Sequence, residues 1–359
     1  MKPKYIFIIV LNAVSLLLFL LAAVLESFTE ASLPDQHMSE RWAGDKKYAQ
    51  ISLFTEDMSP YVLDGIFNAR VDIDKKLVEN SLSPENENSR LWVDAFSTTQ
   101  MKAAVSSDKT TSEVSMIVTG GDFFMFHPQD MISGYYYSDD DTMHDRVVID
   151  NVLAWQLYGA SDIVGKPVII NGKYFYVAGV FRPSENSDSE KVYGSKPRLF
   201  MPYRGYELLG ETPYFSCYEV CLPDPVTGLG KQIISDVIKM DKESYRLVEN
   251  SSRYGLKNRF LLLRDAGIRS VVDIPIVYPY WENAARITED RSVVLLILQI
   301  LGLVFPAGTV LYFFRKLLKN RKKLAKKAFD KLKDLFGKIR RNSRKTPASP
   351  EKGETAVKV

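Results

Sequence analysis

Two long runs without a charged residue constrain this chain more than any other feature of its sequence. Tyr5–Leu25 and Val293–Phe314 contain no Asp, Glu, Lys or Arg. Each run exceeds the roughly 20 helical residues that span a bilayer core about 30 Å thick. The sequence therefore predicts a membrane protein with transmembrane helices at residues 1–26 and 293–314.

The first run could instead be a cleaved signal peptide. Its apolar part is longer than the roughly 7–15 residues of a signal sequence, and residues 22–26 (AAVLE) offer no small-x-small cleavage site. We therefore predict an uncleaved anchor. Neither run contains a charge, so an ion path through this chain alone is not expected. In the second run, Gly302, Pro306 and Gly308 either kink the helix, admit a neighbouring helix, or are simply tolerated in lipid.

The distribution of charge predicts the orientation. The chain of 359 residues has a net charge of only +3, yet residues 315–345 hold 15 Lys and Arg against two Asp. Lys2 and Lys4 precede the first run. Because basic flanks stay in the cytoplasm, both termini are expected there, with residues 27–292 outside the plasma membrane.

The basic segment has a helical pattern of its own. Its apolar residues recur at helical spacing at Leu324, Ala328, Leu332, Leu335 and Ile339. We predict a basic amphipathic cytoplasmic helix over 315–345, whose residues 316–341 lie on anionic inner-leaflet lipid. A solvated stop-transfer tail is the alternative. Residues 346–359 are expected to be disordered.

The segment 27–292 is expected to be an α+β domain with a mixed sheet, in one lobe or two. Polar stretches at Ser81–Ser89 and Pro183–Lys196 are candidate boundaries. Asn171-Gly172 between apolar runs predicts a two-residue hairpin. Helices are predicted from Ser59-Pro60 to about Leu82, with Val62, Ile66, Ala69, Ile73 and Leu77 on one face, and at Asn151–Tyr158 and Leu229–Met240; strands are predicted at Tyr48–Phe54, Val114–Val118, Val147–Ile149, Val168–Asn171, Phe175–Phe181 and Tyr214–Leu222.

No set of residues predicts catalysis, cofactor binding or metal binding. Gly159–Lys166 has five residues between its glycines, whereas a phosphate loop needs four, and Pro167 stands where Ser or Thr is required. Asp139–Asp141, near His144 and Asp145, lacks the spacing of a calcium loop and is predicted to be an acidic surface loop. We therefore expect neither an enzyme nor a nucleic-acid-binding protein.

Cys217 and Cys221 are the only cysteines. Four residues along a strand span roughly 13 Å, since each residue advances about 3.3 Å. A disulfide needs Cα atoms within about 7 Å. The sequence therefore favours two buried thiols on one face of a sheet, with an intermolecular bridge as the lesser alternative.

Six short motifs in a fixed order resemble a known family. They are Gly120–Phe124 (GGDFF), Met131–Tyr137 (MISGYYY), Val147–Gly159 (VVIDNVLAWQLYG), Asp162–Lys166 (DIVGK), Val168–Gly172 (VIING) and Phe175–Phe181 (FYVAGVF). This order resembles the extracytoplasmic core domain of the MacB/FtsX-type ABC transporter permeases. The pattern is close over Val114–Arg182 and looser over Tyr48–Pro223. Typical members have four spans, so this chain resembles a two-span variant.

The resemblance implies a function. Domains of this family transmit movement and do not perform reactions. It implies a non-catalytic permease-like subunit that relays motion between an ATPase and the cell envelope, with an ABC-type ATP-binding subunit and a fuller permease as partners. The alternative is a standalone envelope sensor or scaffold, favoured by the smaller number of spans.

Overall fold

The computed structural model describes residues 3–56, 63–86, 89–183, 196–265, 276 and 278–343. The chain divides into two compact units, Ala22–Ile297 and a unit formed by Met1–Leu21 with Leu298–Val359. We call the first unit the head. The predicted helix start at Ser59-Pro60 and the predicted disordered tail at 346–359 lie outside the described residues.

Two long helices carry the apolar runs, α1 (Pro3–Ala31) and α10 (Tyr280–Ser343). Both are long and apolar enough to cross a membrane. In the second unit they contact each other, since the Asn12 side-chain amide donates to Thr309 Oγ1 at 3.0 Å. A Cβ on Gly302 would lie 2.9 Å from the Ser15 carbonyl oxygen, so this glycine permits the close approach of α1.

The basic segment is not a separate element. α10 continues without a break through Pro306 and through the predicted boundary at 315 to Ser343. Residues 315–343 therefore extend the helix that carries the second apolar run. The cytoplasmic position of this segment and its contact with lipid remain predictions.

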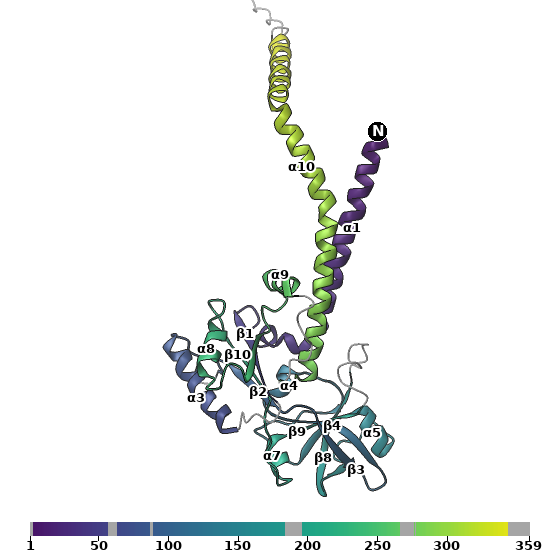
Figure 1. Cartoon of the computed structure of the whole chain (residues 1–359), viewed down its shortest axis with the longest axis vertical. Coiled ribbons are helices and arrows are strands. Elements are labelled where there is room, and N and C mark those ends of the chain that lie inside the picture. The colour runs from purple at the N-terminus through teal and green to yellow at the C-terminus, as the bar shows by residue number, and fades with distance from the viewer. Residues whose placement is uncertain are drawn as a thin grey trace, which may run out of the picture. The chain divides into compact units, whose positions relative to one another are not determined.

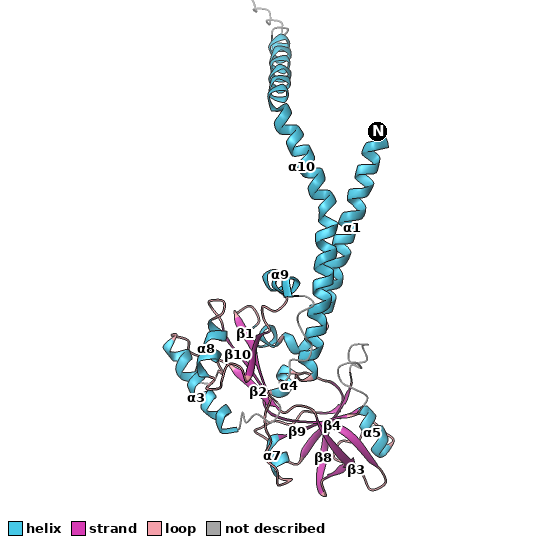
Figure 2. Cartoon of the chain, in the orientation of Figure 1, coloured by secondary structure: helices cyan, strands magenta, loops and turns pink. Residues whose placement is uncertain are grey.

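The head holds a mixed sheet, as the sequence predicted (Figure 2). Its strands pair in the order β11-β1-β10-β2-β4-β3-β7-β8-β6-β9, and β5 pairs with β8. The strands are β1 (Tyr48–Thr55), β2 (Val93–Ser97), β3 (Met101–Ser106), β4 (Thr111–Gly121), β5 (Asp130–Gly134), β6 (Arg146–Asp150), β7 (Pro167–Ile170), β8 (Lys173–Arg182), β9 (Arg198–Pro202), β10 (Cys217–Pro223) and β11 (Tyr245–Glu249). The shorter helices are η1 (Pro34–Gln36), α2 (Met38–Ala43), α3 (Leu63–Glu79), α4 (Phe123–Phe126), α5 (Asn151–Tyr158), α7 (Tyr203–Glu207), α8 (Leu229–Val237) and α9 (Leu256–Asp265).

One part of the sheet is the antiparallel set β11-β1-β10-β2, which α3 and α8 cover on one face (Figure 1). The apolar face predicted for α3 is confirmed, because Ile66, Ala69, Ile73 and Leu77 are all buried. Val62, the first predicted member of that face, lies outside the described residues. A second apolar cluster, which includes Phe54 and Trp281, covers the opposite face of these strands. Since both faces are covered, β1 is buried almost throughout and lacks strong alternation.

The other part of the sheet closes on itself. β4 pairs with β3 on one side and with β9 on the other, so β4-β3-β7-β8-β6-β9 forms a six-stranded ring. The predicted hairpin at Asn171-Gly172 joins β7 to β8, with positive φ at both residues. The predicted helix α5 begins at the Asp150 carboxylate, which accepts the backbone N–H of Leu153 at 2.8 Å, and ends at Gly159. The predicted α8 is shorter than expected, since it ends at Val237 instead of Met240.

Candidate functional site

Buried polar and charged side chains gather where the ends of α1 and α10 meet the head. They come from α1, η1, α9, α10, strands β1 and β10, the residue after α4 and the segment between β11 and α9. We call this set the ionic junction. Its members are Glu26, Asp35, Gln36, Ser52, His127, Glu219, Asn250, Arg253, Arg259, Glu282, Arg286, Glu289 and Ser292.

His127 lies between two carboxylates and is fully buried. Its Nδ1 is 2.8 Å from Asp35 Oδ1, and its Nε2 contacts Glu219 Oε2 directly. Burial alone would lower the pKa of His127, but the charge of Glu219 and hydrogen bonds to both carboxylates raise it to about 9. The imidazole is therefore a cation at neutral pH, with both N–H groups donating to carboxylates. The Trp281 ring of α10 packs against it, with ring centroids 4.0 Å apart.

A chain of side-chain hydrogen bonds connects this histidine to α10. Glu219 Oε1 accepts from Ser52 Oγ at 2.6 Å, and Ser52 Oγ accepts from the Asn250 amide at 2.7 Å. Asn250 Oδ1 in turn accepts from Arg253 Nη1 at 3.4 Å. Polar groups on the central strands β1 and β10 are thus linked to the arginine that binds α10.

Arg253 joins the segment before α9 to α10. Its guanidinium donates to both oxygens of Glu282, at 2.6 and 2.8 Å, and its Nε donates to Glu289 Oε1 at 2.6 Å. Burial alone would lower the pKa of Arg253, but the charges of Glu282 and Glu289 raise it well above its ordinary value. Arg286 donates to Glu282 at 2.9 Å and stacks on the Tyr278 ring. This end of α10 is held by charge-assisted, bidentate bonds, which are the stronger and more directional kind.

The same arrangement reaches α1. Glu26 Oε1 pairs with Arg259 Nη2 of α9 at 2.5 Å and accepts from Ser292 Oγ of α10 at 3.0 Å. Beyond α1, Gln36 of η1 accepts from Arg253 Nη1 at 3.3 Å. Because buried charges are costly to separate from their partners, a shift of either helix within the head would break favourable pairs. The junction can therefore fasten the two helices to the sheet.

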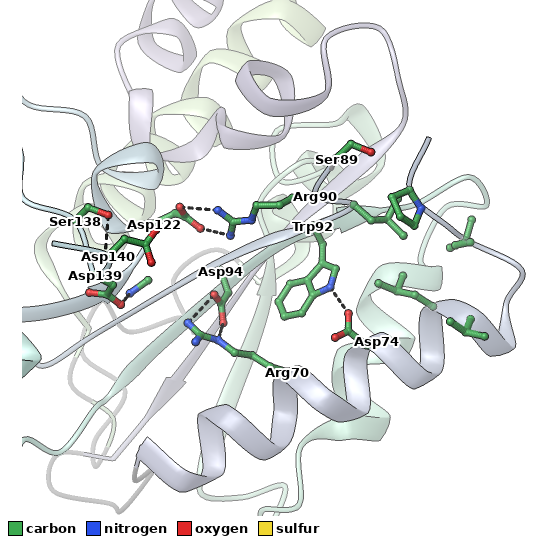
Figure 3. A pocket seen from close by; sticks show the side chains of 16 residues that line it. Arg70, Asp74, Ser89, Arg90, Trp92, Asp94, Asp122, Ser138, Asp139 and Asp140 are labelled. Atoms are coloured by element: carbon green, nitrogen blue, oxygen red, sulfur yellow. Dashed lines mark hydrogen bonds and ion pairs between the residues drawn. The ribbon is translucent and has the colours of Figure 1, made fainter. Parts of the chain in front are cut away.

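A second feature of the head is a pocket of about 740 Å³ beside α3 and β2 (Figure 3). Its floor holds the pair Arg70–Asp94, with hydrogen bonds of 2.7 and 2.9 Å. Trp92 lines the wall and donates its indole N–H to Asp74 at 2.7 Å. Leu77, Val78, Leu82 and Leu91 add apolar surface. The pocket combines charged and apolar walls.

The predicted acidic loop contributes to this pocket. Asp139 and Asp140 line it, and Asp139 accepts the backbone N–H of Gly121 at 2.5 Å. Burial raises the pKa of Asp139 to about 6, although the hydrogen bond from Gly121 lowers it. The prediction of a plain surface loop is therefore incomplete for Asp139, which is partly buried and lines the pocket. Among the described residues, no three His, Cys, Asp or Glu side chains form a group that could hold a metal ion.

The two cysteines are confirmed as buried free thiols of one strand face. Both lie on β10 and both join the apolar cluster that includes Trp281. Burial raises the pKa of Cys221 to about 12, and burial with the nearby Glu219 raises the pKa of Cys217 well above its ordinary value. Such thiols are poor nucleophiles, which agrees with a structural role.

The turn at Gly120-Gly121 delivers α4 and His127 into the junction. Gly121 has φ +65°, and a Cβ there would lie 2.5 Å from the Asp94 carbonyl oxygen. A Cβ on Gly120 would lie 2.2 Å from the Phe96 ring. Only glycine fits at these two positions, because a Cβ would clash at each and Gly121 has a positive φ. The turn leads directly into α4, so Phe123 and His127 are buried against the sheet.

A family described as the MacB-like periplasmic core domain matches residues 13–227, more than half of the chain. The chain belongs to this family. The match confirms the resemblance noted in the sequence and extends it into the first apolar run. A MacB-like domain together with two apolar helices indicates a membrane protein of the ABC transporter permease type.

Solved structures of MacB-like domains are also similar to this chain. The extracellular domain of the noncanonic ABC-type transporter YknZ from Gram-positive bacteria has 13% identity and a TM-score of 0.38, over 55% of this chain and 99% of that one. The periplasmic region of MacB from Actinobacillus actinomycetemcomitans has 13% identity and a TM-score of 0.39, over 56% and 89%. No curated protein matches the chain.

The MacB-like match ends at residue 227 and therefore leaves out part of the ionic junction. Asp35, Ser52, His127 and Glu219 lie inside it, whereas the α10 partners follow it. Sequence reasoning missed the junction. The available signal lies in β1, where the polar residues Gln50 and Ser52 alternate with apolar ones. Both are buried, and polar side chains are unusual in a buried strand.

Proposed function

We propose that this MacB-like protein is a non-catalytic, two-span permease-like subunit of an ABC transporter, which relays motion between an ATPase and the cell envelope. In this arrangement both termini are cytoplasmic and the head is extracytoplasmic. The partners are an ABC-type ATP-binding subunit and a fuller permease subunit. Residues 316–341 of α10 contact anionic inner-leaflet lipid.

The ionic junction is the observation that carries this proposal. A relay requires that a displacement of the spans reach the head without being absorbed at the attachment point. Arg253 binds two carboxylates that stand about two turns apart on α10, and Glu26 links the end of α1 to the same helix. Both spans thus end in one buried set of charges that continues through Ser52 to the central strands. Closely packed, charge-paired contacts transmit displacement because they do not deform gradually.

The partner can be tested directly. We would isolate the tagged chain from its own membranes in a mild detergent and identify the co-purifying proteins by mass spectrometry. The proposal expects an ABC ATPase in near-equal amount. Recovery of envelope proteins alone would refute it and would support the second candidate, a standalone sensor or scaffold whose head pocket receives the signal.

The relay itself is tested by Glu289→Gln. This change removes the negative charge of one of the two carboxylates that bind Arg253. The bidentate Arg253–Glu282 pair remains to hold the fold. We expect the variant to retain the ATPase but to lose any ATP-dependent change in protease sensitivity of the head. Glu113→Gln, which breaks an exposed pair with Lys196, is the matched control and should behave as wild type.

A further inference from the structure

Helix α9 exposes an apolar side that the relay does not use. Leu256, Phe260 and Leu261 have 61%, 49% and 42% of their surface exposed. Leu256 and Phe260 are four residues apart, so they lie on the same face of the helix. Arg259, three residues after Leu256, lies beside this face and is buried against Glu26. Figure 1 shows α9 apart from the strands of the head.

The partners of Arg259 define the level at which α9 lies. Glu26 directly follows Leu25, the last residue of the first apolar run, in the same helix. Ser292, which donates to Glu26, directly precedes Val293, the first residue of the second run. The pair Glu26–Ser292 therefore marks the boundary at which both apolar runs leave the hydrocarbon layer. Arg259 ties α9 to that boundary with a 2.5 Å ion pair.

The composition of α9 fits that level. A short helix with large apolar side chains on one side and cations near its ends is typical of a segment that lies in the membrane interface. Lys257 is exposed beside Leu256, where it can meet lipid phosphate. At this boundary, exposed Leu and Phe side chains would meet acyl chains instead of water, which is favourable for apolar surface.

We propose that α9 is an interfacial helix that inserts Leu256 and Phe260 into the leaflet on the head side of the membrane. The occupant of this apolar side is lipid, since Arg259 ties α9 to Glu26 and through it to Ser292, the residues at which the two apolar runs end and begin. The proposal depends on α1 and α10 crossing the membrane and is independent of any ATPase. The role of α9 in this arrangement is to fix the tilt of the head on the bilayer surface.

The test places a tryptophan at Phe260 in the full-length chain, reconstituted in phosphatidylcholine vesicles. Phe260→Trp is compared with Tyr174→Trp, an exposed aromatic position in the β7–β8 hairpin. Vesicles with lipids brominated close to the headgroup quench tryptophans that reach the acyl chains. We expect loss of most of the added emission for Phe260→Trp and none for Tyr174→Trp, with the native tryptophans subtracted from the unmodified chain.

A second reporter guards against a misfolded variant. Leu256→Trp, one turn earlier on the same face, should be quenched in the same way, while near-ultraviolet circular dichroism confirms the folded head. If neither reporter is quenched in folded chains, the lipid contact is refuted. If the reporters are shielded from brominated lipid but cross-link to a second protein, the apolar side is a protein interface and the proposal is equally refuted.

Discussion

The charge on His127 predicts how the stability of the head depends on pH. Its pKa of about 9 in the folded chain compares with an ordinary value of 6.5. A histidine with a raised pKa stabilises the fold fully below its unfolded value, and this contribution is lost as the pH rises through the folded value. The expected window is therefore pH 6.5 to 9. Each pKa unit corresponds to about 1.4 kcal/mol, so the contribution at stake is about 3 kcal/mol.

The assay is urea unfolding of the full chain in a mild detergent, followed by near-ultraviolet circular dichroism. Between pH 6.5 and 8, the free energy of unfolding should fall by about 2 kcal/mol, at about 1.4 kcal/mol per pH unit. This range stops below the ionisation of unfolded cysteine thiols, which would otherwise add to the loss because the pKa of Cys217 is also raised.

The variant Glu219→Gln tests whether His127 causes the fall of the free energy of unfolding with pH. The charge of Glu219 is the largest factor that raises the pKa of His127, so its removal should flatten the slope to less than about half. Asp35 still pairs with the imidazole, and no carboxylate is left isolated. Glu113→Gln, at an exposed pair, should keep the wild-type slope. A flat wild-type profile, or equal slopes in wild type and Glu219→Gln, would show that His127 is not held as a cation between the two carboxylates.

Three further results are expected. Cys217 and Cys221 should not react with a thiol reagent until urea unfolds the chain, and a cross-linked product on a non-reducing gel would contradict their placement. Gly121→Ala should lower the free energy of unfolding by about 1–3 kcal/mol, because the added Cβ meets a backbone carbonyl at positive φ, whereas Gly172→Ala has open space and should cost less. Asp150→Ala should cost about 1–2 kcal/mol through loss of the helix cap, and an unchanged urea midpoint would exclude that role.

Local signals made several elements predictable from sequence. Asn171-Gly172 determines the β7–β8 turn through its own backbone preferences, and Asp150 with Gly159 determines the ends of α5. The face of α3 follows from apolar residues at helical spacing. In each case the residues that specify the structure are neighbours in the chain, so pattern and propensity are sufficient.

The elements that were missed depend on distant partners. β2 (VDAFS) carries Asp94 at a buried position, which a strand pattern disfavours, and its charge is compensated by Arg70 on α3. The ionic junction poses the same difficulty on a larger scale. Asp35 and Arg253 are of types that usually stay exposed, and only the fold brings them and His127 to their partners. No spacing in the sequence reports such a meeting.

The pairing of β1 has a consequence for how the head is made. β1 lies between β10 and β11, with Phe54 opposite Cys217 on one side and Arg246 on the other. During synthesis this strand therefore leaves the ribosome long before either neighbour exists. Pairings of such high contact order form slowly and leave strand edges open in the meantime. The head can assemble its central sheet only after nearly all of it has been synthesised, so a chain that stalls before residue 245 would leave β1 exposed to aggregation or degradation.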